Sequence, residues 1–121
     1  MMVIELEQKE GICVLRFQGR LVSGTDPEYL RSKADEVKRL NCGKVLADFR
    51  EVTAIGSMGM GFIVGIYTSL AKNPDGRFVL VGCVPRVREV LDLTRLSTVI
   101  PMAADMESGL IALRGASGAG G

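Results

Sequence analysis

Apolar and charged residues alternate near the start of the chain. The alternating run spans Val3 to Glu7, and a second, mostly apolar strand candidate spans Ile12 to Phe17 after a turn at Lys9-Glu10-Gly11. This period of two is typical of strands that bury one face, so the runs predict an antiparallel hairpin. After Gly19, the small residues of Arg20 to Thr25 predict a loop.

Four later segments have helical spacing. The first begins with Asp26, a side chain that can cap free amides, followed by Pro27 at the first helical position. It ends at Asn41-Cys42-Gly43, which predicts a left-handed cap. The other three start near Gly59, Pro85 and Asp105.

Strands are predicted between these helices. They are expected at Lys44–Phe49, followed by a turn at Arg50-Glu51, at Phe78–Val81 and at Thr98–Ile100. The order β-β-α-β-α-β-α-β-α requires parallel crossovers late in the chain, so we predict an α/β fold with one mixed sheet of four to five strands. One domain is expected over residues 1–114, and residues 115–121, which contain only Gly, Ala and Ser, are expected to form a flexible tail.

Composition narrows the function. Of the 121 residues, 47 % are hydrophobic and 24 % charged, with a formal net charge of +1. A balanced charge is not the electrostatic footprint of a nucleic-acid or anionic-membrane binder. No apolar run approaches the roughly 20 residues of a membrane span. The N-terminus lacks a signal-peptide pattern, and a cytoplasmic location is expected.

Histidine is absent and cysteine is sparse. Without histidine, Ser-His-Asp and Cys-His catalytic systems are excluded, and no metal, cofactor or enzymatic activity is predicted. Cys13 and Cys83 lie in apolar runs, where a reduced cysteine packs as a small hydrophobic residue. With Cys42 they make an odd, widely spaced set, so no disulfide framework and a reducing compartment are expected.

The glycine-rich segment from Gly56 to Gly65 fits no enzyme motif. It lacks the third glycine of a dinucleotide fingerprint in register, the first glycine of a nucleophile elbow and the lysine of a Walker loop. It does place Ser57 where a strand passes into a helix, whose positive end tolerates a phosphate. Ser57 is then either a phosphorylation site or simply a helix cap. Met58 and Met60 are either core or contact residues.

Two segments carry a resemblance to a known family. Residues 48–61, DFREVTAIGSMGMG, look like the STAS-domain signature, a strand ending in Asp-Leu-Ser followed by Val-x-x-Ile-Asp-Ser-Ser-Gly-Leu-Gly. Residues 78–96, FVLVGCVPRVREVLDLTRL, resemble the family's LVLVG…P-x-V-x-x-V-L-x-L-T-G-L, and Gly19-Arg20-Leu21 resembles its Gly-x-Leu/Ile. Here Gly56 and Met58 replace an aspartate and a serine or threonine, and Arg95 replaces a glycine.

The resemblance implies a regulatory role by partner switching. It implies helices packed mainly on one side of the sheet, and an anti-sigma factor partner, a serine kinase of ATPase fold, that the unphosphorylated protein binds so that a sigma factor is released. That kinase would phosphorylate Ser57, and a PP2C-like, metal-dependent phosphatase would remove the phosphate. The expected partner-binding residues are Leu21, Ser23, Thr25, Gly56, Ser57, Met58 and Met60.

The alternative is a diverged, non-phosphorylated STAS scaffold or small-ligand-binding module in a signalling complex, which Gly56 and Met58 favour. No direct contact with nucleic acid or membrane is expected. A homodimer is left open.

Overall fold

The described residues form a five-stranded sheet with four α-helices. The computed structural model describes residues 2–22 and 26–119, and side-chain burial as far as residue 114. In chain order the elements are β1 (Val3–Lys9), β2 (Ile12–Leu21), α1 (Pro27–Arg39), β3 (Lys44–Ile55), α2 (Ser57–Ala71), β4 (Arg77–Val81), α3 (Pro85–Leu93), η1 (Leu96–Thr98), β5 (Met102–Ala103) and α4 (Met106–Ala119). The predicted α/β fold and element order are confirmed.

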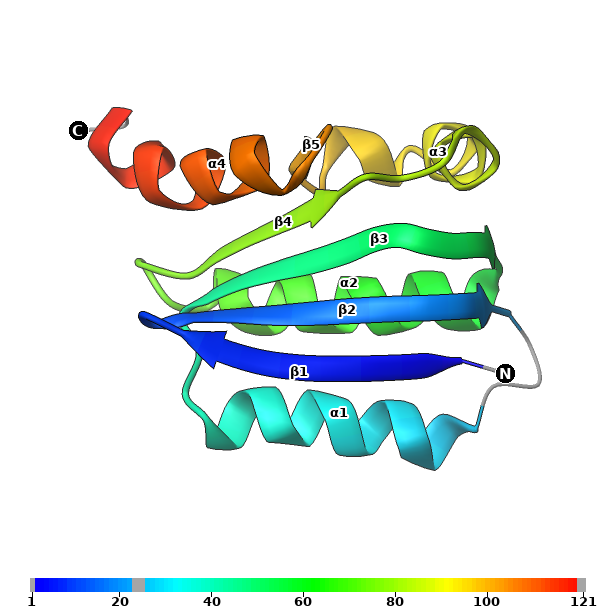
Figure 1. The fold of residues 1–121 in the computed structure, drawn as a ribbon, viewed down its shortest axis with the longest axis horizontal. Coiled ribbons are helices and arrows are strands. Elements are labelled where there is room, and N and C mark those ends of the chain that lie inside the picture. The colour runs from blue at the N-terminus through cyan, green and yellow to red at the C-terminus, as the bar shows by residue number, and fades with distance from the viewer. Residues whose placement is uncertain (1, 23–25, 120–121) are drawn as a thin grey trace.

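The strands lie in the order of the sequence, β1-β2-β3-β4-β5. β1 pairs antiparallel with β2, and every later pair is parallel. Figure 1 shows α2 crossing behind the central strands, with α1 along β1 and α4 along β4. Because β2 and β3 are parallel, their C-terminal ends, Leu21 and Ile55, lie side by side at the end of the sheet where α2 begins.

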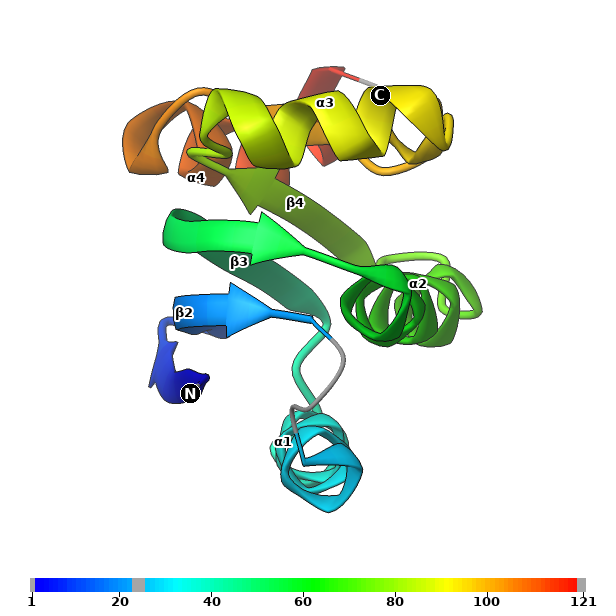
Figure 2. The same ribbon diagram turned by 90° about the vertical axis from the view of Figure 1, so that its right-hand side faces the viewer.

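The two faces of the sheet bury cores of different size. The larger cluster includes Phe17 and Phe49 and takes side chains from α1, α2 and α3, whereas the smaller one holds Leu46, Val79 and Leu113 beneath α4. The ring centroids of Phe17 and Phe49 lie 4.8 Å apart, in tilted contact. Figure 2 shows α2 standing to one side of the strands. Three helices pack on one face, as expected.

Two strands run further than predicted. β2 continues past Gly19 to Leu21 and stays paired with β3. The register shifts between Arg16 and Gln18 and between Gly19 and Arg20, and each shift accommodates one extra residue of β3. The turn predicted at Arg50-Glu51 is wrong: β3 is continuous, with Glu51 still paired to Gln18. Part of the predicted loop, Ser23 to Thr25, lies outside the described residues.

The C-terminal part also departs from the expected boundaries. The strand predicted at Thr98–Ile100 is wrong. Residues Leu96–Thr98 form a short 3-10 helix and Ile100 is buried, so the strand forms after Pro101, at Met102–Ala103. α4 begins at Met106, close to the predicted start, and its helical backbone runs on to Ala119 instead of ending at Gly115. Residues 115–119 contain no proline, the residue that most strongly stops a helix from extending.

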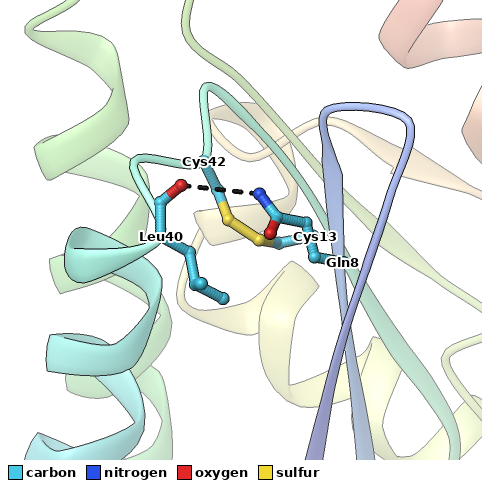
Figure 3. Close-up of a disulfide and its surroundings, with 4 residues drawn as sticks. All are labelled: Gln8, Cys13, Leu40 and Cys42. Atoms are coloured by element: carbon cyan, nitrogen blue, oxygen red, sulfur yellow. Dashed lines mark hydrogen bonds between the residues drawn. A yellow bond between two sulfur atoms is a disulfide. The ribbon is translucent and has the colours of Figure 1, made fainter.

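A disulfide joins Cys13 to Cys42, which corrects the expectations that the chain has no disulfide and that Cys13 is a reduced core residue (Figure 3). Their Cα atoms lie 5.9 Å apart, a separation that suits a disulfide. The sequence separation of 29 residues hid the pairing, which follows from topology. Cys13 is the second residue of β2, and Cys42 precedes the neighbouring strand β3 by two residues. Cys83 is a free cysteine, as expected, and is half-buried against the larger core cluster.

Candidate partner-binding site at the start of α2

The backbone around Gly56 fixes where α2 begins. Gly56 is the N-cap residue, with φ −124° and ψ −172°, an extended conformation open to any residue. Its N–H donates to the carbonyl of Leu21 (2.8 Å), and its carbonyl accepts from the N–H of Met60 (2.9 Å). The first hydrogen bond attaches the helix start to the end of β2, and the second begins the helix.

Ser57 is exposed and does not cap the helix. It is the first residue of α2, and the cap position, taken by Gly56, makes no side-chain hydrogen bond. No described residue hydrogen-bonds the Ser57 hydroxyl, and the first turn has no acidic residue. The amides of this turn therefore point outward without a partner side chain, and the positive end of the helix dipole lies at Ser57. The interpretation of Ser57 as a cap is wrong.

Leu21 belongs under the site and not on its surface. It is fully buried, and the first turn of α2 rests on it at Gly59. The expectation that Leu21 contacts a partner directly is therefore wrong, because a residue with no exposed area positions its neighbours only. Ser23 and Thr25 lie outside the described residues. Gly56 is half-buried against Val22, whose Cα would be 3.5 Å from a Cβ at Gly56.

Met58 and Met60 serve the core and the surface at once. Both are half-buried and pack against the larger core cluster. Their remaining area lies on the same helical turn as the Ser57 hydroxyl. Methionine is flexible and polarizable, which makes such area suitable for protein contact. The structure thus brings Gly56, Ser57, Met58 and Met60 together in one place.

The whole of α2 is uncharged. Its 15 residues contain no Asp, Glu, Lys or Arg, and its outward positions include Ser57, Gly61, Gly65 and Thr68. An exposed helix face normally carries charges, because they are the least costly groups to leave in water. A face of small, neutral side chains is easy to desolvate, which suits an area that another protein covers.

A buried carboxylate in the middle of β3, away from the start of α2, was not predicted from the sequence. Asp48, 2 % exposed, accepts hydrogen bonds from the Arg50 side chain (2.8 and 3.0 Å) and backbone N–H (3.1 Å) and lies 3.6 Å from Arg16 Nε. Burial by itself would raise the pKa of Asp48, but these hydrogen bonds and the two guanidinium charges outweigh it and hold the pKa below its usual value. A lone aspartate in the apolar run Val45–Phe49, two residues before an arginine, was the available signal.

A groove separates α1 from α2 beside the larger core. It encloses about 340 Å³ and is lined by Ala34, Val37, Lys38, Asn41, Cys42, Gly61, Phe62, Gly65, Ile66, Ser69, Leu70 and Asn73. Gly61 and Gly65 supply no side chain: a Cβ on either would meet no atom within 4 Å. The groove is wide enough for a small molecule or a flexible side chain.

The described part of the chain holds one free thiol, that of Cys83. Among its residues, no group of three or more His, Cys, Asp or Glu side chains is placed to hold a metal ion. Burial raises the pKa of the Cys83 thiol to about 11, so it is protonated at neutral pH and a poor nucleophile. No helix within the described ranges is both long and apolar enough to cross a bilayer.

Comparison with known proteins places the chain in a family. A family model for the STAS domain matches residues 3–109. The chain belongs to the STAS domain family. An anti-sigma F factor antagonist from Paenibacillus polymyxa is 27 % identical over 100 residues, covering 82 % of this chain and 84 % of that protein.

Solved structures share the STAS fold. A putative anti-sigma factor antagonist from Thermotoga maritima superposes with a TM-score of 0.84 at 22 % identity, covering 92 % of this chain and 94 % of that one. The Bacillus cell fate determinant SpoIIAA, solved in its phosphorylated form, gives a TM-score of 0.65 at 22 % identity, covering 88 % and 96 %. At these identities the structures show the fold alone.

Proposed function

We propose that this STAS protein is an anti-sigma factor antagonist that binds an anti-sigma factor through the start of α2 and is switched by phosphorylation at Ser57. The observation that carries the proposal is the Ser57 hydroxyl, exposed and without a structural task, at the uncapped N-terminus of an uncharged helix. The names of similar proteins, an anti-sigma F factor antagonist among them, support the same role.

A phosphate at Ser57 is compatible with the fold. Free amides of the first turn donate to phosphate oxygens, and the helix dipole favours the negative charge. The hydroxyl is solvent-exposed, so the added group displaces no core residue. Phosphorylation therefore changes the surface and leaves the packing of α2 on Leu21 and Phe17 in place.

The same phosphate opposes partner binding. It adds roughly −1.5 to −2 charges to a helix that has none. A partner covering Met58 and Met60 would have to strip water from this group, and removing a charge from water without a matching cation costs several kcal/mol. Binding of the unphosphorylated form and release of the phosphorylated form follow from one local change.

The proposed partners are those that the resemblance to the STAS family implies. The anti-sigma factor is a serine kinase of ATPase fold that transfers the γ-phosphoryl group of ATP to Ser57 Oγ, and a PP2C-like phosphatase hydrolyses the ester. Both enzymes need Ser57 to be accessible, which it is. The antagonist itself supplies no catalytic group, and its action is to occupy the anti-sigma factor so that the sigma factor is released.

The test is transfer of phosphate by the candidate anti-sigma kinase. The purified kinase, Mg²⁺-ATP and this protein are incubated, and the phosphorylated residue is mapped by mass spectrometry. We expect one phosphate, on Ser57, that is lost in Ser57→Ala and kept in Ser69→Ala, a matched change on the same helix. Phosphate on another residue, or none, rejects the proposal.

The second candidate is the non-phosphorylated STAS scaffold or ligand-binding module. Gly56 favours it, because the signature has an aspartate there that would cap the helix and could contact a kinase. The groove between α1 and α2 favours it as well, since it has the size of a small-ligand site. The same phosphorylation assay separates the two candidates.

A further inference from the structure

The Cys13–Cys42 disulfide connects two elements at the end of the sheet remote from Ser57. Cys13 lies at the beginning of β2, and Cys42 lies in the turn between α1 and β3. Since β2 and β3 are parallel and Ser57 follows the last residue of β3, bond and serine lie at opposite ends. The bond fixes the C-terminal end of α1 to the sheet.

We propose that Cys42 is a site of thiol–disulfide exchange, reached through the groove between α1 and α2 by a low-molecular-weight thiol that carries carboxylates. Cys13 has no exposed area, whereas Cys42 is 7 % exposed and forms part of the groove lining. An attacking thiolate must reach a sulfur along the axis of the bond, so access decides which sulfur is attacked. Cys42 is the electrophile and Cys13 the leaving group.

The groove suits an anionic thiol. Its lining includes one charged side chain, Lys38, together with Asn41 and Cys42. A carboxylate on the incoming thiol would pair with the Lys38 ammonium and accept a hydrogen bond from the side-chain amide of Asn41. Gly61 and Gly65 leave the opposite wall open, which gives the thiol room to enter.

The exchange balances with two thiols. A thiolate attacks Cys42 Sγ, the Cys13–Cys42 bond breaks, and Cys13 leaves as a thiolate that takes a proton from water. This leaves a mixed disulfide on Cys42. A second thiolate attacks the sulfur of the bound small thiol, which departs as a symmetrical disulfide, and Cys42 is released as a thiolate. Two small thiols are oxidised and one protein disulfide is reduced.

Opening the disulfide loosens the end of α1. Apart from the disulfide, one polar contact drawn in Figure 3 spans from the α1 end to the hairpin, the bond from Gln8 Nε2 to the carbonyl of Leu40 at 3.5 Å. It is long and exposed, so it contributes little. The last turn of α1 then frays more often, and its amide hydrogens exchange faster than those of α2.

Glutathione is the probe for the test. The protein is purified without reductant, its free thiols are counted in denaturant, and samples taken during incubation with glutathione are alkylated and mapped. We expect one free thiol at the start, Cys83, and then glutathione on Cys42 and not on Cys13. Three free thiols at the start, or glutathione on Cys13, overturns the proposal without any variant.

Two variants test the route. Gly65→Leu fills the groove, and Thr68→Leu adds the same side chain to an exposed position of α2 outside the lining. Since exchange depends on access, we expect reduction by glutathione to be about tenfold slower or more in the first and unchanged in the second. Equal rates in two folded variants reject the groove as the entry. No anti-sigma factor is used, so the result is independent of the proposed function.

Discussion

Leu21 and Gly59 lie so close that no side chain fits between them. A Cβ on Gly59 would be 2.5 Å from Leu21 Cγ and 2.6 Å from the Leu21 carbonyl oxygen. The same carbonyl accepts the N–H of Gly56. Leu21, the last residue of β2, therefore fixes how far the first turn of α2 lies from the end of β2, and so fixes the position of Ser57.

Gly59→Ala is expected to destabilise the protein. The methyl group must push α2 away from Leu21, and such overpacking costs about 1–3 kcal/mol. Urea unfolding measures the loss. The control is Gly61→Ala, two residues on, where a Cβ meets nothing within 4 Å and the better helix propensity of alanine gives a gain of up to about 1 kcal/mol. Equal effects of the two changes would contradict the close contact.

Gly56→Asp should strengthen the start of α2. The extended backbone of Gly56 accepts an aspartate, its Cβ would have ordinary contacts with Val22, and the carboxylate would cap free amides at the positive end of the helix. A charge at this place stabilises by about 0.3–1 kcal/mol. The gain is read from thermal unfolding at pH 7. It should shrink near pH 3, where the carboxylate is protonated, and a gain that is equal at both pH values would argue against capping.

Acid should weaken the fold through Asp48. Its pKa lies below the usual value, so the folded state binds a proton less readily than the unfolded state. The stabilisation is complete above the unfolded pKa, about 3.9, and is lost as the pH falls through the folded pKa. Asp48→Asn is expected to cost about 1–3 kcal/mol at pH 7, because Arg50 loses its buried partner. It should also flatten the stability curve below pH 4, and an unchanged acid slope would contradict this account.

Arg95 occupies a backbone conformation that favours glycine. Its φ is +64°, in the left-handed region, at the position where the family pattern has glycine. Arg95→Gly is therefore expected to stabilise by roughly 1 kcal/mol. Glu89→Gly, in the exposed middle of α3, is the control and should destabilise by a similar amount. If Arg95→Gly also lowers the thermal unfolding temperature, the left-handed backbone at Arg95 does not reduce the stability of the protein.

The sequence predicts the architecture because its period-two and helical patterns are local. The ends of elements that depend on pairing with neighbouring strands are harder to predict from the sequence. Arg50-Glu51 looks like a turn, yet it stays in β3 because β2 pairs alongside it and Asp48 binds the charge of Arg50. The last strand also depends on its neighbour. The sequence predicts it before Pro101, but the pairing with β4 begins only after this proline, at Met102.

The site was predictable in part. The glycines and the serine mark the strand-to-helix junction, and the spacing places Met58 and Met60 beside it. Burial cannot be read from this pattern, so the sequence predicts Leu21 as a partner contact although it is buried beneath Gly59. The Cys13–Cys42 pair also required the fold, because only the parallel pairing of β2 and β3 brings two cysteines 29 residues apart together.

The most direct test of the central claim is the affinity for the anti-sigma factor, measured by calorimetry for the wild type, Ser57→Ala, Ser57→Asp and Thr68→Asp. Thr68→Asp adds the same charge to another exposed position of α2. We predict that Ser57→Ala and Thr68→Asp stay within about threefold of the wild type and that Ser57→Asp binds about 100-fold more weakly, a loss of about 2.7 kcal/mol. Wild-type affinity of Ser57→Asp, or an equal loss in Thr68→Asp, would contradict a phosphorylation switch at Ser57.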